Sequence, residues 1–175
     1  MFKAKENLVL MHKEKLKAQI ADYIISNKEK YYRVAYSYVK NQDNALDIMQ
    51  ESIYKAILHI DSLQDISYIN TWFYRIIVNT SIDFMRKQKK LIPVDDEILK
   101  NFDSEVNDQY ENFDLKRAMD NLPEKYKTVV ILRYFEDLKI KEIAEIINEN
   151  TNTIKTRLYK SLKLLRIKMN DYKEI

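Results

Sequence analysis

The sequence predicts an all-α protein made of two small helical domains that an acidic linker joins. The first observation is compositional: the 175 residues include no glycine and two prolines, although globular proteins usually contain about 7% glycine. Glycine-rich phosphate-binding loops and glycine-built hairpins are therefore excluded. The second observation is that apolar residues recur at helical spacing in several segments. The third is that two basic stretches flank an acidic one.

The missing residue types narrow the chemistry of the chain. There is no cysteine, so a disulfide, a thiol nucleophile and a thiolate zinc site are excluded. His12 and His59 lie far apart in the sequence, which disfavours a catalytic histidine or a histidine-based metal site, whereas carboxylates alone could still bind Mg²⁺. We expect no cofactor, no small-molecule substrate and no catalytic residue. The chain begins without the apolar core of a signal peptide and has no run of about 20 apolar residues, so we expect a cytoplasmic protein.

Charge divides the chain into blocks. Residues 1–92 carry a net charge of +5, residues 93–114 of −7 and residues 115–175 of +5. The acidic block has few periodic apolar residues, so it predicts a linker, either a solvated spacer or a nucleic-acid mimic that occupies a basic channel on a partner. The expected parts are an N-terminal extension (1–24), a first domain (25–92), the linker (93–113) and a second domain (114–175).

The second domain begins with a predicted helix after Pro123, which suits a first helical turn. This helix continues to Phe135, although Thr128–Ile131 would also suit a buried strand. A break follows at residues 136–138. The next helix is short, and it has four apolar residues on one face at helical spacing. They are Ile140, Ile143, Ala144 and Ile147.

A turn and a long basic helix complete the second domain. The turn is predicted at residues 148–150, because asparagine is the best substitute for glycine where φ is positive. Thr151 is the predicted N-cap of the last helix. From Asn150 to Met169 this helix holds six cations and no carboxylate. Its predicted buried sector contains Ile154, Leu158, Leu162, Leu165 and Met169.

A short helix, a tight turn and a basic helix with small polar residues at its start indicate a helix-turn-helix. The short side chains of Asn152, Thr153 and Thr156 let such a helix enter the major groove and hydrogen-bond base edges, and Lys160 is long enough to reach a guanine. The alternative is an amphipathic helix with a solvated basic face. The remaining candidates lie on or beside the same face. Lys155, Arg157 and Lys163 are the predicted phosphate contacts, and Tyr159 belongs to the DNA-facing set.

Three helices are predicted in the first domain: one through Tyr32–Val39, one from about Asp43 to His59 and one from about Asn70 to Lys90. The middle helix has an outer polar stripe of Asp47, Gln50, Glu51 and Tyr54, which by pattern alone is a solvated face. Its predicted inward residues are Ala45, Ile48, Met49, Ser52, Ile53, Ala56 and Ile57. The core residues expected on the third helix are Trp72, Phe73, Ile76, Ile77 and Phe84.

The third helix contains an anomaly at Val78-Asn79-Thr80-Ser81, which are poor helix formers in mid-helix. Such local inconsistencies often mark functional positions. The Asn79 amide can both donate and accept, so it could hydrogen-bond an exposed base. The basic end of this helix, residues 86–90, indicates either favourable charge at a helix C-terminus or contact with a DNA backbone.

Both domains resemble parts of an extracytoplasmic-function (ECF) sigma factor of the sigma-70 family. Residues 114–170 resemble region 4, through Leu122–Tyr126, Leu132–Phe135, Lys141–Ile146 and Asn152–Leu162. Residues 25–92 resemble region 2, through Tyr32–Tyr36, Ala45–Ile53, Trp72–Asn79 and Asp83–Lys87. The chain departs from the family pattern at Asn148 and Asn152, where glycine is usual, and at Leu46 and Ile53. We expect Ile53 to fill the core site of the family's aromatic residue.

This resemblance implies a transcription initiation factor rather than an enzyme. It implies that Asp47, Gln50 and Glu51 dock on the β′ clamp helices of core RNA polymerase, and that region 4 meets the β flap. It also implies that Leu63 and its neighbours, with Asn79, capture a flipped base of the minus-ten element. The full minus-ten set is Leu63, Trp72, Arg75, Ile76, Asn79, Arg86 and Lys87. The implied minus-thirty-five set is Asn152, Thr153, Lys155, Thr156, Arg157, Tyr159, Lys160 and Lys163.

Within the family, Tyr36–Asp47 and Asn150–Tyr159 are similar to the sigma-V subgroup of low-GC Gram-positive bacteria. That similarity implies a membrane-anchored anti-sigma factor, which would hold the protein at the inner membrane face, and a response to cell-envelope stress, lysozyme in particular. The second domain alone also resembles a response-regulator DNA-binding domain. Two rival functions remain: a stand-alone helix-turn-helix regulator that does not bind polymerase, and an enzyme built on Asp95, Asp96 and Glu97.

Overall fold

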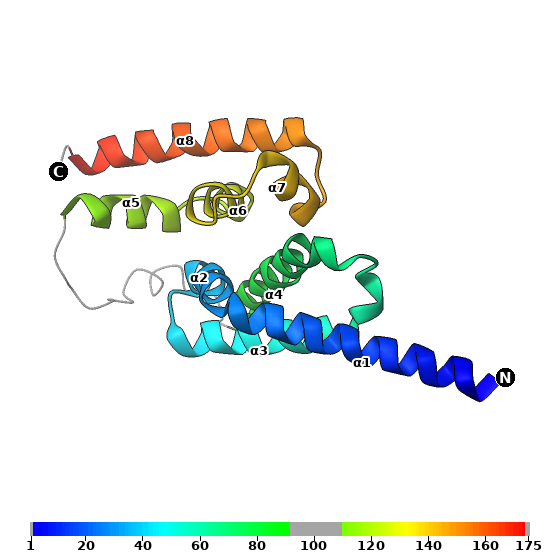
Figure 1. Ribbon diagram of the computed structural model, residues 1–175. Helices are drawn as coiled ribbons and strands as arrows, with labels where there is room; N and C mark the ends of the chain where they lie inside the picture. The colour runs from blue at the N-terminus through cyan, green and yellow to red at the C-terminus, as the bar shows by residue number, and fades with distance from the viewer. Residues whose placement is uncertain (1, 92–109, 174–175) are drawn as a thin grey trace. The chain divides into compact units, whose positions relative to one another are not determined.

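The computed structural model describes residues 2–91 and 110–173, and all regular secondary structure in these ranges is helical (Figure 1). The all-α prediction is therefore confirmed. The chain divides into two compact units, Met1–Phe84 and Met85–Ile175. Most of the predicted linker lies outside the described residues, and its last four positions belong to helix α5 (Tyr110–Asp120).

In its described residues, the first unit contains four helices and two short 3-10 turns. The predicted helices are all present, with boundaries shifted by a few residues. The elements are α1 (Phe2–Ser26), α2 (Lys28–Val39), α3 (Gln42–Leu58), the turns Ile60–Ser62 and Ile66–Tyr68, and α4 (Ile69–Leu91), whose last residues run past the unit boundary.

Three aromatic residues form the centre of the first unit. The ring of Tyr31, from α2, meets Phe73 edge-on at 4.5 Å and Tyr74 at 5.1 Å, measured between ring centroids. All three side chains are fully buried, and edge-to-face pairs of this kind are favourable beyond the area they bury. The Tyr31 hydroxyl is 3.4 Å from the amide oxygen of Asn70. Helices α2 and α4 are thereby fixed to each other near the start of α4.

The predicted N-terminal extension, residues 1–24, lies almost entirely in helix α1. Its C-terminal half packs against the rest of the first unit, because Ile20 and Ile24 are buried. Lys13 also forms an ion pair with Asp61, in the turn after α3, at 2.7 Å. The sequence gives little signal for this helix, since its apolar residues do not gather on one face.

Helix α3 buries a narrower stripe than predicted. Ile53 and Ile57 are 37% and 52% exposed, so the predictions that they point inward, and that Ile53 fills a core site, were wrong. The buried stripe of α3 holds small residues, including the fully buried Ser52. Small side chains let the neighbouring helix approach closely, so positions on the flank of the stripe stay uncovered. The buried residues are Ala45, Ile48, Met49, Ser52 and Ala56.

The anomaly in α4 has a packing explanation. The helix runs unbroken through Val78–Ser81, and Thr80 and Ser81 are buried. The Ser81 hydroxyl donates to the carbonyl oxygen of Ile77 at 2.7 Å, and the Lys55 ammonium donates to the Thr80 hydroxyl at 3.3 Å. Poor helix formers are tolerated here because they are small and their hydroxyl groups are bonded. Asn79 alone in this segment is exposed.

Among the described residues 110–173, the second unit contains four helices and one π-helical turn. Helix α5 was not predicted, and Thr128–Ile131 is helical, so the strand alternative was wrong. Helices α5, α6 and α7 all pack against α8. The bounds of the elements after α5 are α6 (Glu124–Val130), the π-helical turn Ile131–Phe135, α7 (Ile140–Ile147) and α8 (Thr151–Lys173).

The predicted break at residues 136–138 is confirmed, and backbone geometry explains it. The Glu136 N–H bonds the carbonyl oxygen of Ile131 at 3.2 Å, and the Leu138 N–H bonds that of Leu132 at 3.0 Å. The helix therefore widens before it ends. Asp137 then takes a positive φ of 50°, which turns the chain into α7.

Candidate nucleic-acid interface

The turn between α7 and α8 forms without glycine. Asn148 adopts left-handed backbone angles, φ 54° and ψ 51°, as predicted for an asparagine in glycine's place. Its N–H bonds back to the last carbonyl groups of α7, at Ala144 and Glu145. This turn fixes the direction in which α8 leaves α7.

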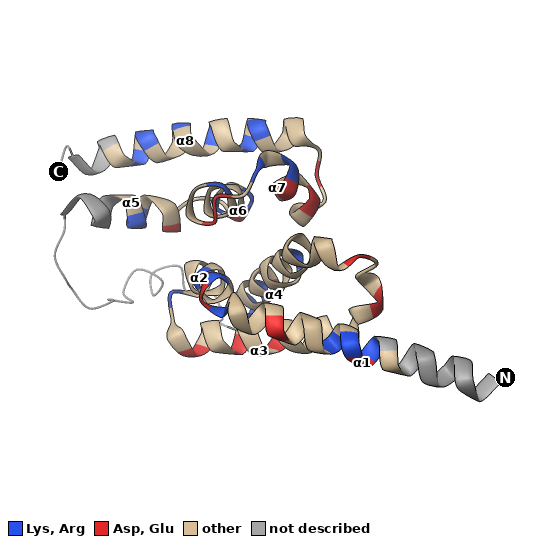
Figure 2. Ribbon diagram, viewed as in Figure 1, with Lys and Arg blue, Asp and Glu red and all other residues tan. Residues whose placement is uncertain are grey.

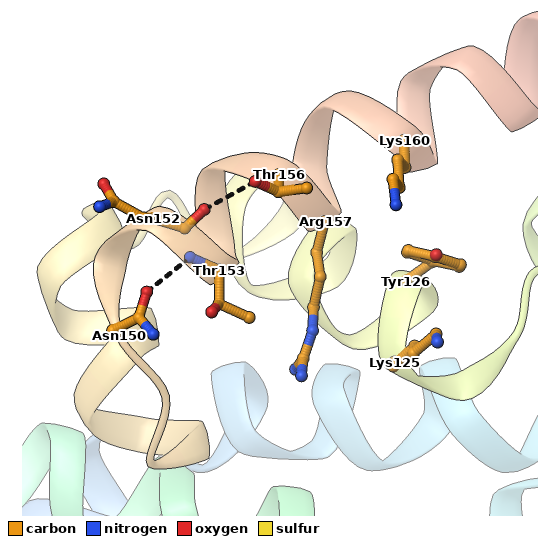
Figure 3. Close-up of a pocket in the computed structure, with 8 residues that line it drawn as sticks. All are labelled: Lys125, Tyr126, Asn150, Asn152, Thr153, Thr156, Arg157 and Lys160. Carbon is orange, nitrogen blue, oxygen red and sulfur yellow. Dashed lines mark hydrogen bonds between the residues drawn. The ribbon is translucent and has the colours of Figure 1, made fainter.

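Asn150 rather than Thr151 caps helix α8, so that detail of the prediction was wrong. The Asn150 side-chain oxygen accepts a hydrogen bond from the Thr153 N–H at 2.8 Å (Figure 3). Thr151 is already the first helical residue. Asparagine and threonine are both good N-caps. Because the helix starts one residue earlier than predicted, the cap is Asn150. The N-terminal turn of α8 is therefore ordered by its own sequence.

The buried face of α8 is centred on Ile154, Leu158, Ser161 and Leu165. Leu162 is 45% exposed, so its predicted place in this sector was wrong. Ser161 takes the sector instead: its hydroxyl donates to the Arg157 carbonyl at 2.6 Å and lies 3.3 Å from the Tyr126 carbonyl. A small residue here brings α8 close to α6, which places the N-terminal half of α8 beside the start of α6.

An open pocket of about 590 Å³ lies between the start of α6 and the first turns of α8 (Figure 3). It brings together five residues predicted to contact the minus-thirty-five element: Asn152, Thr153, Thr156, Arg157 and Lys160. The other three of that set lie outside the pocket lining and are exposed on α8: Lys155, Tyr159 and Lys163. Three further residues line the pocket and were not among the predicted site residues: Lys125, Tyr126 and Asn150.

The pocket is cationic. Lys125, Arg157 and Lys160 line it, and none of its eight lining residues is acidic. Basic residues recur along α8 (Figure 2). The Lys125 ammonium lies 5.2 Å from the centroid of the Tyr126 ring, within cation–π range. The guanidinium of Arg157 pairs with the Glu149 carboxylate in the turn before α8. The N-terminus of a helix and nearby cations both suit anionic oxygen atoms.

The missed residues Lys125 and Tyr126 carry a weak sequence signal. They belong to the start of α6, more than twenty positions before the basic helix, and only packing brings them to it. The one sign in the sequence that another helix approaches α8 closely is the small Ser161 in a stripe of otherwise large apolar residues. It does not identify which helix approaches.

The outer face of α3 carries the predicted polymerase-docking residues. Asp47, Gln50 and Glu51 are all exposed, and Glu51 is 3.5 Å from the Lys55 ammonium. Large apolar side chains are also exposed on α3, and only Tyr54 among them belonged to the predicted outer stripe. They are Leu46, Ile53, Tyr54, Ile57 and Leu58.

The predicted minus-ten residues lie in and after the loop that precedes α4. Leu63 is buried, 6% exposed, and the Trp72 indole donates to the Ser62 hydroxyl at 2.9 Å. Ile76 is half-buried, whereas Asn79 is exposed on α4. The charged members of the set, Arg75, Arg86 and Lys87, are also exposed on α4.

The described part of the chain offers no metal site and no membrane-spanning helix. Within residues 2–91 and 110–173, no group of three or more His, Cys, Asp and Glu side chains is arranged to hold a metal ion. In the same ranges, no helix is both long and apolar enough to cross a membrane. Asp95, Asp96 and Glu97, the basis of the enzyme alternative, lie outside the described residues.

Comparison with known families identifies both units. The family model for sigma-70 region 2 matches residues 24–91, and the model for sigma-70 region 4 matches residues 112–165. Among curated proteins, RNA polymerase sigma factor SigV of Bacillus subtilis is 52% identical over 157 residues, which cover 90% of this chain and 95% of SigV. The chain is an ECF sigma factor.

Two further comparisons agree with this family. The ECF RNA polymerase sigma factor SigW of B. subtilis is 32% identical over 166 residues, covering 86% of this sigma factor and 89% of SigW. The solved structure of the sigma factor RpoE of Bartonella quintana, in complex with the anti-sigma factor NepR, matches the fold with a TM-score of 0.70 at 22% identity. It covers 86% of this chain and 96% of RpoE. The predicted family is thus confirmed, and sigma factors are transcription initiation factors that bind core RNA polymerase and promoter DNA.

Proposed function

We propose that this sigma factor recognises the minus-thirty-five element with the pocket between α6 and α8, and binds core polymerase and the minus-ten element with its first unit. The observation that carries the proposal is the pocket itself: it combines short polar side chains, two exposed lysines and a helix N-terminus on one surface. That combination suits a DNA major groove, where short side chains read bases and lysines neutralise phosphates.

In the second unit, the first turns of α8 enter the groove. Asn152, Thr153 and Thr156 are the proposed base-reading residues, because their short side chains let the helix backbone approach the base edges. Lys160 stands one turn after Thr156 and is exposed, so its reach suits a guanine. Lys155 and Lys163 are exposed on α8 and are assigned to phosphates, and Tyr159, 72% exposed, is assigned to the DNA backbone or the adjacent sugar.

Lys125 is added to the proposed interface. It comes from α6 yet lines the same pocket as Lys160, so the two cations lie on different elements around one surface. In this position Lys125 suits a phosphate at the edge of the groove that Lys160 enters. The Tyr126 ring lies against the Lys125 ammonium, 5.2 Å from ring centroid to nitrogen, and so helps to hold it at the pocket. Contacts with backbone phosphates fix the register of the helix without reading sequence.

In the first unit, the outer face of α3 is the proposed docking surface for the β′ clamp helices. Its mixed character supports the assignment, since exposed acids and large apolar side chains stand together there, as in the rim and centre of protein interfaces.

The second unit is proposed to meet the β flap. Exposed Asn79 and the basic residues of α4 are proposed to contact the opened minus-ten element, with Leu63 and Trp72 forming the wall of the base pocket. The acidic linker is proposed to follow a basic channel of the polymerase.

Control by an anti-sigma factor is proposed as well. RpoE of B. quintana was solved in complex with NepR, and the identity to SigV supports the sigma-V subgroup assignment. For that subgroup we propose a membrane-anchored anti-sigma factor, hence a location at the inner face of the membrane before release, and a response to cell-envelope stress such as lysozyme.

In the holoenzyme, the two weak promoter contacts of the two units act together because one chain tethers them.

The direct test is transcription. The full chain is added to core RNA polymerase from B. subtilis, and runoff transcripts are collected from a library of genomic fragments of the source organism. The proposal predicts transcripts from a small set of fragments that share two spaced elements. A stand-alone regulator would instead bind operator duplex without polymerase and give no transcripts. Absence of both transcripts and co-purification with core would overturn the proposal.

A further inference from the structure

The ion pair between Arg157 and Glu149 changes the role expected for Arg157. Glu149 stands in the turn between α7 and α8, and Arg157 stands two turns into α8. The Arg157 Nη2 atom pairs with the Glu149 Oε1 atom, and the two side chains are 23% and 35% exposed. A pair this far removed from water is stronger than the exposed surface pairs of ordinary proteins.

Glu149 occupies the centre of a turn whose two ends are already fixed. On one side Asn148 holds a left-handed backbone conformation. On the other side Asn150 caps α8 through the Thr153 N–H. The carboxylate between them is bonded to a residue of α8 itself, so the ion pair connects the turn to the body of the helix that the turn aims.

Charge gives the second argument. A guanidinium that is paired with a carboxylate presents little net charge to a phosphate, and it must leave that partner before it can bind one. Separating a partly buried ion pair is unfavourable, because each charge loses its partner and the carboxylate is left uncompensated. Lys125 and Lys160 line the same pocket, are exposed and meet no such requirement. The DNA therefore has better cationic ligands than Arg157, namely Lys125 for a phosphate and Lys160 for a base edge.

We infer that Arg157 is a positioning residue: through its ion pair with Glu149 it fixes the turn that sets how α8 enters the DNA groove, and it does not itself contact DNA. This inference rests on the proposed function of α8. It replaces the assignment of Arg157 to the phosphate contacts, and it gives Glu149, an acidic residue beside a DNA-binding surface, a positive role in binding.

The first experiment compares Arg157→Gln, Glu149→Gln and Lys160→Gln in the full chain. Holoenzyme binding to a labelled promoter fragment is measured over a range of salt concentrations, and the melting temperature of the free protein is measured alongside. If Arg157 is a positioning residue, Arg157→Gln and Glu149→Gln both lower the melting temperature and both weaken binding by about tenfold, with the salt slope unchanged. Lys160→Gln is the control for a direct contact.

A direct phosphate contact at Arg157 predicts a different pattern. Arg157→Gln would reduce the salt slope by about one, as for any lost phosphate contact. Glu149→Gln would then tighten binding, because it removes a negative charge and releases a cation. Either result overturns the inference.

The second experiment reverses the pair by combining Arg157→Glu with Glu149→Arg. Arg157→Glu alone is expected to weaken binding strongly, and the double substitution is expected to recover both the melting temperature and promoter binding. Recovery of the melting temperature without recovery of binding overturns the inference. If the reversed pair recovers neither, the salt slope of Arg157→Gln decides the question.

The two proposals can fail separately. If the wild-type holoenzyme does not bind any promoter fragment, the proposed function fails. If Arg157→Gln leaves the melting temperature of the free protein unchanged, the positioning role fails, whatever the DNA result.

Discussion

The indole N–H of Trp72 donates to the hydroxyl oxygen of Ser62 at 2.9 Å, and the Ser62 hydroxyl donates in turn to the carbonyl oxygen of His59 at 2.7 Å. The first residues of α4 are thereby linked to the loop that leaves α3. Leu63, which follows Ser62 directly, is buried. The loop proposed to hold a base of the minus-ten element is thus fixed at one point by a hydrogen bond and at the next by packing.

Ser62→Ala is therefore expected to loosen this loop and to slow promoter opening severalfold, while binding to core polymerase stays unchanged. The lost hydrogen bond is exposed, so the free energy of unfolding falls by only about 0.5 kcal/mol. Trp72 is the single tryptophan, and its emission spectrum reports the change in the free protein. Permanganate footprinting of the melted bubble measures opening, and Ser37→Ala on α2 serves as the control. If the emission spectrum changes but the footprint does not, the order of this loop does not affect promoter opening and the prediction is wrong.

Asn79→Ala tests the exposed amide on α4. Because the side chain is exposed and no part of the core, the substitution is expected to leave the fold and core binding intact. Loss of edge hydrogen bonds to a flipped base is expected to reduce opening by about 1–2 kcal/mol, or roughly tenfold. The same footprint on the same promoter checks this outcome. Wild-type reactivity of the minus-ten thymines in the variant would rule out a base contact by Asn79.

Most of the fold was predictable from sequence, because apolar residues at helical spacing predict α2, α3, α4, α7 and α8, and Pro123 predicts the start of α6. The exceptions have physical causes. Helix α1 lacks an apolar face and depends on two buried isoleucines, Ile20 and Ile24, and an ion pair to a distant turn. Helix α5 begins in an acidic stretch that pattern alone assigns to a linker.

The candidate site was predictable only where one helix carries it. The α8 residues follow from local spacing, whereas Lys125 and Tyr126 reach the pocket through the close packing at Ser161. The exposure of Ile53 could not be predicted, because a flank position on α3 is buried or not according to how closely the neighbouring helix approaches. The ion pair of Glu149 with Arg157 depends on the geometry of the turn, which sequence spacing does not supply.

Asp47→Arg combined with Glu51→Arg tests the outer face of α3. Both residues are exposed, and the contact of Glu51 with Lys55 at 3.5 Å contributes little to stability at the surface. The double variant is therefore expected to fold normally but to lose core binding, since like charge replaces complementary charge at the interface. Co-purification with tagged core polymerase measures the effect, with Asp83→Arg on α4 as a charge-reversal control outside the proposed docking face. Core recovery equal to wild type would contradict the assignment of this face.

Lys160 and Lys125 are expected to differ in what they contribute to promoter binding. Lys160→Ala should weaken binding to promoter duplex by about 1–3 kcal/mol relative to random duplex, because a base contact carries specificity. Lys125→Ala should weaken binding to both duplexes equally and lower the salt slope by about one, because a phosphate contact carries none. Holoenzyme binding in a salt series distinguishes these outcomes. Lys141→Ala, an exposed lysine of α7 outside the pocket lining, is the control and should change neither quantity.

Asn148→Ala tests whether the turn before α8 depends on its left-handed backbone. Asn148 has a φ of 54° and its side chain is exposed, so any loss of stability comes from the backbone rather than from a contact. A Cβ-bearing residue other than asparagine or aspartate pays about 1 kcal/mol in this conformation, whereas glycine adopts it without strain. Asn148→Ala is therefore expected to lower the free energy of unfolding by about 1 kcal/mol, and Asn148→Gly by much less. Chemical denaturation of the full chain measures both variants, with Asn152→Ala in the first turn of α8 as the control. Equal losses for alanine and glycine at position 148 would mean that the asparagine side chain, and not the backbone angle, stabilises the turn.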